Sequence, residues 1–237
     1  RQDEVYNKGI VTQNKKIKEL KESIEGFNKD TLLGEVKIEG IKNREGTVTS
    51  KEQALRFYAL YQNPVQKNKL QQQGFTDAKI ESIKKQLGSA AITYADNVIE
   101  YLGTEYYNSI NKIYEKNNDI KLTQVENYFP VETLSQREAS DIITGKGGFS
   151  QVFNQTTLSA LKERTDTKGE IDLTPGFSTV LENHLGSMEK YKAYADVVVF
   201  LNNLFNSKKV DALIGTLGVK SIIEKIINAQ INPCISP

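Results

Sequence analysis

The sequence predicts a mainly α-helical protein, built as two helical lobes or as one irregular bundle joined by a long irregular arm. Apolar residues recur at spacings of three and four over several long stretches, and capping patterns, prolines or glycines bound them. The stretch between the two helical parts shows neither feature. We therefore divide the chain into an N-terminal helix with a short hairpin or loop, a helical lobe, an irregular arm and a C-terminal helical lobe: residues 1–48, 49–117, 118–174 and 175–237.

A narrow apolar stripe predicts the first helix. Its members follow one another at spacings of three and four with one gap, as in a coiled coil: Tyr6, Ile10, Ile17, Leu20, Ile24 and Phe27. The pattern fits a surface helix lying on its own domain as well as a partner-binding seam. Glu19 and Glu22 interrupt the lysines of this stretch, which favours ion pairs within the helix over a phosphate-binding track.

Residues 31–50 lose the helical period, because Val36 and Ile38 alternate with charged residues and Gly40 and Gly46 follow. This pattern predicts one short hairpin. The next helix opens at two overlapping capping boxes, in which a hydroxyl residue precedes Glu or Gln by three positions: Thr49 with Glu52, and Ser50 with Gln53. The pair Asn63-Pro64 closes it, since the residue before a proline avoids helical geometry.

Two further helices are predicted before the arm. One begins at Thr76, with Phe75 and Ile80 at the positions of a hydrophobic staple, and ends at Gly88. The other covers residues 89–116 and carries a long apolar face: Ile92, Ala95, Ile99, Leu102, Tyr106, Ile110 and Ile113. Four tyrosines flank that face, and we interpret them as the edge of the core: Tyr94, Tyr101, Tyr107 and Tyr114.

Residues 117–174 form an irregular stretch with glycines, Pro130 and one predicted short helix over 135–143. Such a long connection is unusual within a compact domain, and it indicates a functional arm or a segment that wraps neighbouring subunits. Thr174 and Pro175 then supply an N-cap and a proline at the first position of a long, widely apolar helix. We expect a pair of helices over 209–215 and 219–230 to pack on it.

Composition and charge exclude several classes of function. The chain has 31 basic and 30 acidic residues, so no overall field attracts nucleic acid or an anionic membrane. Its apolar runs are too short for a transmembrane helix. One cysteine excludes an intrachain disulfide framework and a multi-thiolate zinc site. Because the chain starts at Arg1 and its first residues already look helical, we expect a processed product or a fragment of a larger protein.

Side chains that could carry chemistry are few. The single histidine, His184, falls on the apolar side of its helix with no second ligand nearby, which favours a core histidine. The run of glycines at 145–148 lacks the spacing of a phosphate loop and is interpreted as a turn. Glu100, Glu105 and Glu115 could supply the acid of a lytic enzyme, but they fit a solvated helical face better. We expect no catalytic residue, cofactor or metal.

The stretch Val-Glu-Asn-Tyr-Phe-Pro, residues 125–130, resembles part of a known protein family. The chain resembles a module of the large polyvalent proteins of tailed bacteriophages, including crAss-like phages. Besides this stretch, the resemblance rests on the helix near Ser50, the Gly-Phe-Thr helix start, the tyrosine-rich helix and the Leu-Lys-Glu-Arg-Thr run at 161–165. The resemblance covers roughly residues 49–231. Its motifs are structural, so no catalytic residue follows from it.

The resemblance implies a non-enzymatic structural or packaging module of an internal virion protein, a cargo or ejection protein that enters the host cytoplasm with the genome. The implied partners are other virion proteins or copies of the same chain. Nucleic acid stays a possible partner, although the charge does not indicate it. Candidate interaction anchors are Asn127, Tyr128, Phe129, Pro130 and Arg164. The alternative is an inert segment of an ejected enzyme, such as a virion RNA polymerase or a cell-wall lytic factor.

Overall fold

The computed structural model describes residues 2–41, 48–132 and 170–205, with side chains described up to residue 200. The described chain is mainly α-helical, as predicted. In chain order its elements are α1 (Gln2–Glu22), β1 (Glu35–Lys37), β2 (Val48–Ser50), α2 (Lys51–Tyr61), α3 (Pro64–Gln72), α4 (Asp77–Leu87), α5 (Ser89–Tyr101), the π-helix η1 (Leu102–Tyr106), α6 (Tyr107–Asn118) and α9 (Phe177–Phe205). The predictions for 135–143, 145–148, Arg164, 209–215 and 219–230 lie outside the described residues.

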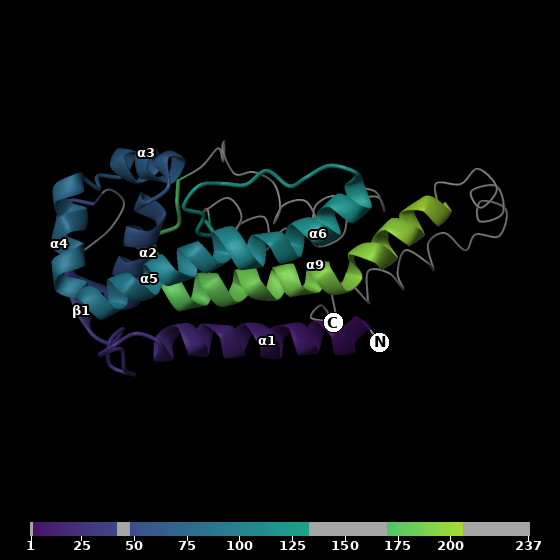
Figure 1. Ribbon diagram of the computed structural model, residues 1–237. Coiled ribbons are helices and arrows are strands. Elements are labelled where there is room, and N and C mark those ends of the chain that lie inside the picture. The colour runs from purple at the N-terminus through teal and green to yellow at the C-terminus, as the bar shows by residue number, and fades with distance from the viewer. Residues whose placement is uncertain (1, 42–47, 133–169, 206–237) are drawn as a thin grey trace, which may run out of the picture.

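Three long helical segments lie side by side, while the short helices and the hairpin gather at one end (Figure 1). α9 contacts α1 on one side and α6 and α2 on the other, and α1 also contacts α5. One hydrophobic core runs through the hairpin, α2 to α6 and α9. The described helices on both sides of the arm therefore share a core, as expected of a single bundle.

The hairpin predicted between the first two helices is present. β1 and β2 pair antiparallel, with Val36 opposite Thr49. Val36 and Ile38 are buried, so the apolar residues that alternate with charged ones in the sequence lie on the buried side of the hairpin. The hairpin leads directly into α2.

Only one of the two predicted capping boxes forms. Ser50 is the N-cap of α2, and its side chain and that of Gln53 satisfy each other's backbone amides. Thr49 therefore lies one residue before the cap, and its hydroxyl donates to Gln53 Oε1 (2.6 Å). The predicted pairing of Thr49 with Glu52 is wrong because two adjacent residues cannot both be the cap of one helix. The Glu52 side chain instead accepts hydrogen bonds at the start of α9.

The break predicted at Asn63-Pro64 is also the start of a helix that the sequence analysis missed. Asn63 Oδ1 accepts hydrogen bonds from the amides of Val65 (3.0 Å) and Gln66 (3.1 Å), and Pro64 is at the first helical position of α3. A proline is tolerated there because its missing N–H would have no partner in the helix. The same two residues thus end α2 and begin α3.

The helix predicted over 89–116 is present as α5, η1 and α6, which run on without a break from Ser89 to Asn118. The five residues of η1 adopt π-helical hydrogen bonding, which the apolar period did not reveal. Tyr94 and Tyr101 are buried in the core, and the ring of Tyr94 lies 5.1 Å from that of Phe27 and 5.5 Å from that of Phe177.

α9 begins at Phe177, two residues after the predicted start, so Thr174 is not its cap and Pro175 is not its first residue. The Thr174 amide and hydroxyl both donate to Asp172 Oδ1 instead. The cap comes from α2: the Glu52 carboxylate accepts from the Ser178 amide and hydroxyl, each at 2.8 Å. A carboxylate is favoured there because helix N-termini carry positive partial charge.

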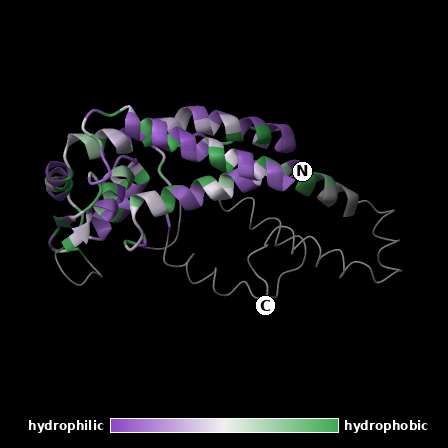
Figure 2. Cartoon of the chain, turned by 90° about the horizontal axis from the view of Figure 1, so that it is seen from below, coloured by the Kyte–Doolittle hydropathy of each residue, from purple (hydrophilic) through white to green (hydrophobic). Residues whose placement is uncertain are grey.

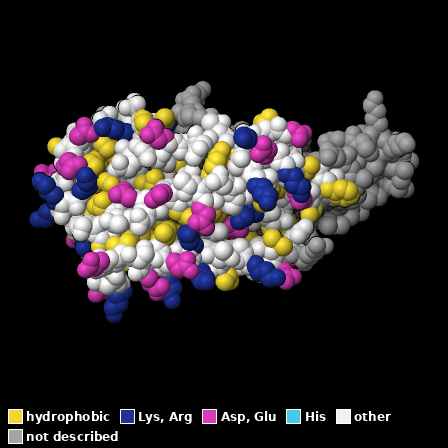
Figure 3. All heavy atoms as spheres, in the orientation of Figure 1, with side chains coloured by type: hydrophobic (Ala, Val, Ile, Leu, Met, Phe, Trp, Pro, Cys, Tyr) yellow, Lys and Arg dark blue, Asp and Glu magenta, His cyan; other side chains and the backbone are white. Residues whose placement is uncertain are grey.

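Hydrophilic and hydrophobic residues alternate along the long helices, as expected of helices with one wet face (Figure 2). On the face shown in Figure 3, the basic and acidic side chains of the described residues are interspersed with no large region of one sign. Within the described residues, no helix combines the length and the apolar character needed to cross a bilayer.

Candidate functional site

The gap in the apolar stripe of α1 is the position of Gln13, the one residue of this helix that is fully buried. Counted with Gln13, the stripe keeps strict alternate spacings of three and four from Tyr6 to Leu20. Gln13 Nε2 donates to Glu189 Oε1 of α9 (2.9 Å), and Gln13 Oε1 accepts from the Tyr101 hydroxyl (2.5 Å). The α1 seam therefore faces its own chain, and a polar contact lies at its centre.

Glu189 is the acceptor at the centre of this polar network and is only 3% exposed. Besides Gln13, its Oε1 accepts from the Tyr106 hydroxyl (3.1 Å) and from Lys192 Nζ (2.9 Å). Burial raises the pKa of the Tyr106 hydroxyl above its usual range, with the nearby Glu189 adding to the effect. The phenol therefore stays protonated at neutral pH and remains a hydrogen-bond donor.

Gly9 of α1 makes room for this carboxylate. A Cβ atom at residue 9 would lie only 2.2 Å from Glu189 Oε2. Glycine in the middle of a helix is ordinarily less stable than alanine. Here the Glu189 side chain occupies the space that a Cβ would fill, so a side chain at residue 9 would displace the carboxylate from its hydrogen bonds. The arrangement is that of a polar contact that fixes the register of two helices, because its donors and acceptors satisfy one another within the interface.

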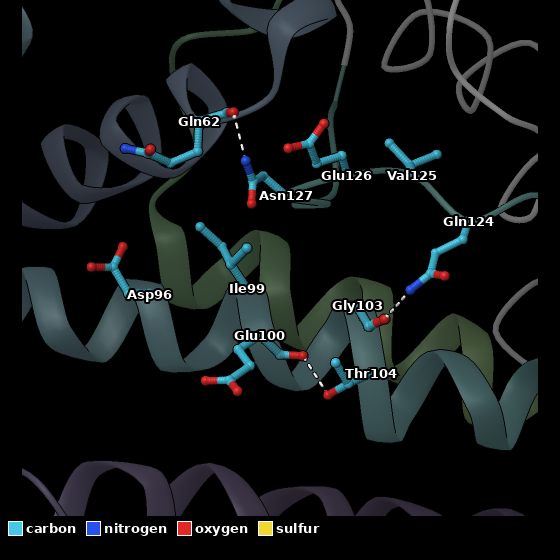
Figure 4. A pocket seen from close by; sticks show the side chains of 10 residues that line it. All are labelled: Gln62, Asp96, Ile99, Glu100, Gly103, Thr104, Gln124, Val125, Glu126 and Asn127. Atoms are coloured by element: carbon cyan, nitrogen blue, oxygen red, sulfur yellow. Dashed lines mark hydrogen bonds between the residues drawn. The ribbon is translucent and has the colours of Figure 1, made fainter.

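A hollow of about 610 Å³ opens beside the π-helix (Figure 4). Its wall is lined by Gln62, Asp96, Ile99, Glu100, Gly103, Thr104, Gln124, Val125, Glu126 and Asn127. Gln124 Nε2 donates to the Gly103 carbonyl (2.7 Å), and Asn127 Nδ2 donates to the Gln62 carbonyl (3.1 Å), so the loop on one side is fastened to α2 and η1.

The hollow is acidic and open to solvent. Asp96, Glu100 and Glu126 are exposed and line it without a basic residue among the lining side chains. Asp96 Oδ1 accepts from the Tyr58 hydroxyl (2.8 Å). No three histidine, cysteine or acidic side chains come close enough to hold a metal ion in the part of the chain that the structure describes. Of the three glutamates considered in the sequence, Glu100 lines this hollow, and Glu105 forms an exposed ion pair with Lys16 (2.7 Å).

The four described candidate anchors lie against their own helices. Asn127 has left-handed backbone geometry (φ 48°) and fastens to α2. The Tyr128 ring lies 5.5 Å from the ring of His184, which is half-buried on α9. Phe129, 2% exposed, stacks on Phe177 at a ring distance of 4.6 Å, and Pro130 is buried. Their role in binding other proteins stays a prediction.

Arg56 of α2 is a functional candidate that the sequence analysis did not identify. It is 0% exposed, and its Nη1 donates to the carbonyls of Asp172 (2.5 Å) and Pro175 (3.3 Å). Burial lowers the pKa of its guanidinium to about 10, although Glu132 and Asp172 act in the opposite direction. In the sequence it is one charged residue between Leu55 and Phe57, and no pattern distinguishes it from an arginine on the helix surface.

Arg56 lies where the chain enters and leaves the stretch 133–169. The Asp172 amide donates to the Glu132 carbonyl (2.9 Å), so the two ends of that stretch are hydrogen-bonded to each other. Gln73 Nε2 holds the adjacent Ile171 carbonyl (3.0 Å). We call Arg56, Gln73, Glu132, Ile171 and Asp172 the neck of the arm.

The chain matches no family model, and neither a curated protein sequence nor a solved structure matches it significantly. The site is therefore interpreted from its own geometry. Glu189 and Arg56, the buried ionisable groups described above, bind to other helices or to the backbone of their own chain. These hydrogen bonds hold α1 against α9 and, with the bond between Asp172 and Glu132, hold the two ends of the stretch 133–169 together.

Proposed function

We propose that this chain is a non-enzymatic structural or packaging module of an internal virion protein of a tailed bacteriophage, acting through protein–protein contacts. Its place is the virion interior, from which it enters the host cytoplasm with the genome. The partners are other virion proteins or further copies of the chain. The proposal joins the resemblance at residues 125–130 to the way in which the buried polar groups are used.

The observation that carries the proposal is the network around Glu189. A buried carboxylate that serves as an acid or base must reach a substrate. Glu189 instead accepts from Gln13, Tyr106 and Lys192 at the interface between α1 and α9, with Gly9 packed over its other oxygen. Such a group supports the rigidity and register of a helical assembly module.

The residues of the resemblance have structural positions that agree with such a module. Phe129 stacks on Phe177 in the core, and Asn127 turns the chain at a left-handed residue. These contacts hold the described beginning of the predicted 118–174 arm against the bundle. A long connection anchored in this way suits a segment that contacts neighbouring subunits.

The structure also changes which side of α1 is available to a partner. The apolar stripe faces α9, so a second protein would meet the outer face of the helix. That face carries intrahelical ion pairs, such as Lys15 with Glu19 (3.7 Å) and Lys18 with Glu22 (3.6 Å). Val11 is also exposed on this face, so a contact there would combine apolar packing with ion pairs, and the ionic part would be sensitive to salt because exposed ion pairs are screened.

Mass spectrometry of purified particles, combined with lysine cross-linking, tests the proposal. We expect peptides of this chain to co-purify with capsid and portal proteins, with cross-links from the outer face of α1 and from the 118–174 arm to other chains. Recovery of the chain as a free monomer without particle proteins would contradict the proposal. Polymerase or lytic motifs in the same polypeptide would instead favour the ejected-enzyme alternative.

A further inference from the structure

The guanidinium of Arg56 has an unused hydrogen-bonding edge. Nη1 holds two backbone carbonyls, but Nε and Nη2 have no partner within the described part of the chain, although both are buried. These two nitrogens share one edge of the planar group and form the fork that matches a carboxylate. A buried donor without an acceptor is unfavourable, so this edge needs an acceptor.

Glu132 is the acceptor that the surroundings supply. Its carbonyl accepts from the Asp172 amide (2.9 Å), and the Asp172 carbonyl accepts from Arg56 Nη1 (2.5 Å), so Glu132 lies beside the guanidinium, whose charged form its carboxylate favours. In this structure its carboxylate points to α9, where Oε1 accepts from Asn183 Nδ2 over a long 3.3 Å. Asn183 is exposed and can bond to water instead, so little opposes the release of Glu132 from it.

We propose that Glu132 is a two-position switch at the neck of the arm. In the position seen here it bonds to Asn183 on α9, and in the other it forms a bidentate ion pair with the free Nε and Nη2 fork of Arg56 on α2. The second position locks the neck, because Arg56 then holds Glu132 through its fork while Nη1 keeps the Asp172 carbonyl. Both ends of the stretch 133–169 are then fastened to one side chain.

This inference goes beyond the proposed function, since it concerns how the base of the arm is held whatever the arm contacts. Where the arm does bind other virion proteins, the switch sets whether Glu132 is bonded to α9 or to α2. That extension rests on the proposed function. The switch itself rests only on the contacts of Arg56, Glu132 and Asn183.

The test is the Nε–Hε signal of Arg56 in nuclear magnetic resonance spectra of the full chain. Arg56→Lys identifies the signal by removing it. We expect the wild-type signal to lie downfield of free arginine and to exchange slowly with solvent. Glu132→Gln should move it towards the free position and speed its exchange, because the amide cannot form the bidentate ion pair.

Asn183→Ala is the matched variant, since it removes the competing donor and leaves both members of the proposed pair. It should move the Arg56 signal further downfield, opposite to the effect of Glu132→Gln. An Arg56 signal that is unchanged by Glu132→Gln would show that ordered water fills the fork, and it would overturn the proposal. A shift in the same direction for both variants would overturn it as well. Neither result bears on co-purification with particles, so the two proposals fail separately.

Discussion

The buried acid Glu189 and the glycine Gly9 face each other where α1 meets α9, and each residue type suits the other. Glu189 can stay in the interface because Gln13, Tyr106 and Lys192 donate to it. Gly9 stays in the helix because any side chain there would meet Glu189 Oε2. At this scale, glycine makes α1 less stable as an isolated helix but leaves room for the polar contact with α9.

Gly9→Ala is therefore expected to destabilise the protein by about 1–3 kcal/mol, the usual range for overpacking, despite the better helix propensity of alanine. The new Cβ would lie 2.2 Å from Glu189 Oε2, and the carboxylate can move only by breaking its bonds to Gln13 or Tyr106. Unfolding in urea measures the change.

The matched control is Gly186→Ala, since this glycine lies in α9 with nothing within 4 Å of an added Cβ. We expect that variant to be neutral or more stable, by up to about 1 kcal/mol. Equal changes in the free energy of unfolding for the two variants would mean that Gly9 is not required by Glu189.

At the scale of elements, one side chain of α2 begins another helix. Glu52 lies in the first turn of α2, and its carboxylate takes the amide and the hydroxyl of Ser178 at the start of α9. The packing is close, because a Cβ on Gly176 would lie 3.0 Å from Glu52 Cβ. α9 is thus capped from a distance in sequence, and its N-terminus depends on the position of α2.

Glu52→Ala should destabilise the chain by about 0.5–2 kcal/mol, as the loss of an N-cap does elsewhere. Hydrogen exchange should also become faster at the Ser178 amide, which loses its acceptor. Glu81→Ala is the control, because Glu81 forms only an exposed ion pair with Lys84 (3.0 Å) and should change stability by less than about 0.5 kcal/mol. Equal effects would argue that Glu52 is an ordinary surface acid.

α1 is held less firmly than the helices of the core, because Gln13 is its one fully buried residue whereas α2 buries eight. We expect hydrogen exchange in α1 to proceed through local opening at a lower free energy than exchange in α2. Gln13→Ala should increase exchange across α1 and leave α2 unchanged. The same protection for both helices in the wild-type protein would contradict this view of the seam.

At the scale of the whole molecule, buried tyrosines connect stability to alkaline pH. Burial raises the pKa of Tyr58, Tyr94, Tyr101 and Tyr106 above the usual value of 10. The folded protein therefore keeps protons that the unfolded chain loses as the pH passes 10. Their contribution to stability is complete below pH 10 and is lost above it.

We expect the free energy of unfolding to fall steadily above pH 10. Arg56, whose folded pKa is lowered to about 10, acts in the opposite direction, but it is one group against these four and Tyr191, whose pKa burial raises to about 12. Tyrosinate absorbance and circular dichroism recorded together measure the effect. The buried tyrosines should ionise only as the helices unfold, whereas complete ionisation with the helical signal intact would show that these side chains are accessible to solvent.

Much of the fold follows from the local pattern of residues. Neighbours within four residues set the starts of α2 at Ser50 and of α4 at Thr76, and the end of α4 at Gly88. Simple alternation of buried and exposed residues sets the hairpin at Val36. Local propensity and periodicity are sufficient there because the deciding contacts are themselves local. The apolar stripe of α1 has a gap at Gln13, but only the structure shows that this position is buried.

The candidate sites could not be predicted in the same way. Arg56 joins Asp172, Gln13 joins Glu189, and Glu52 joins Ser178, and each pair is far apart in the sequence. A single charged residue in a helical pattern looks the same whether it is solvated or buried, since only its distant partner decides the difference. The sequence thus determined the hairpin, the balanced charge and the long helices, but neither α3 nor the π-helical turn, while tertiary packing decided which polar side chains would connect the elements.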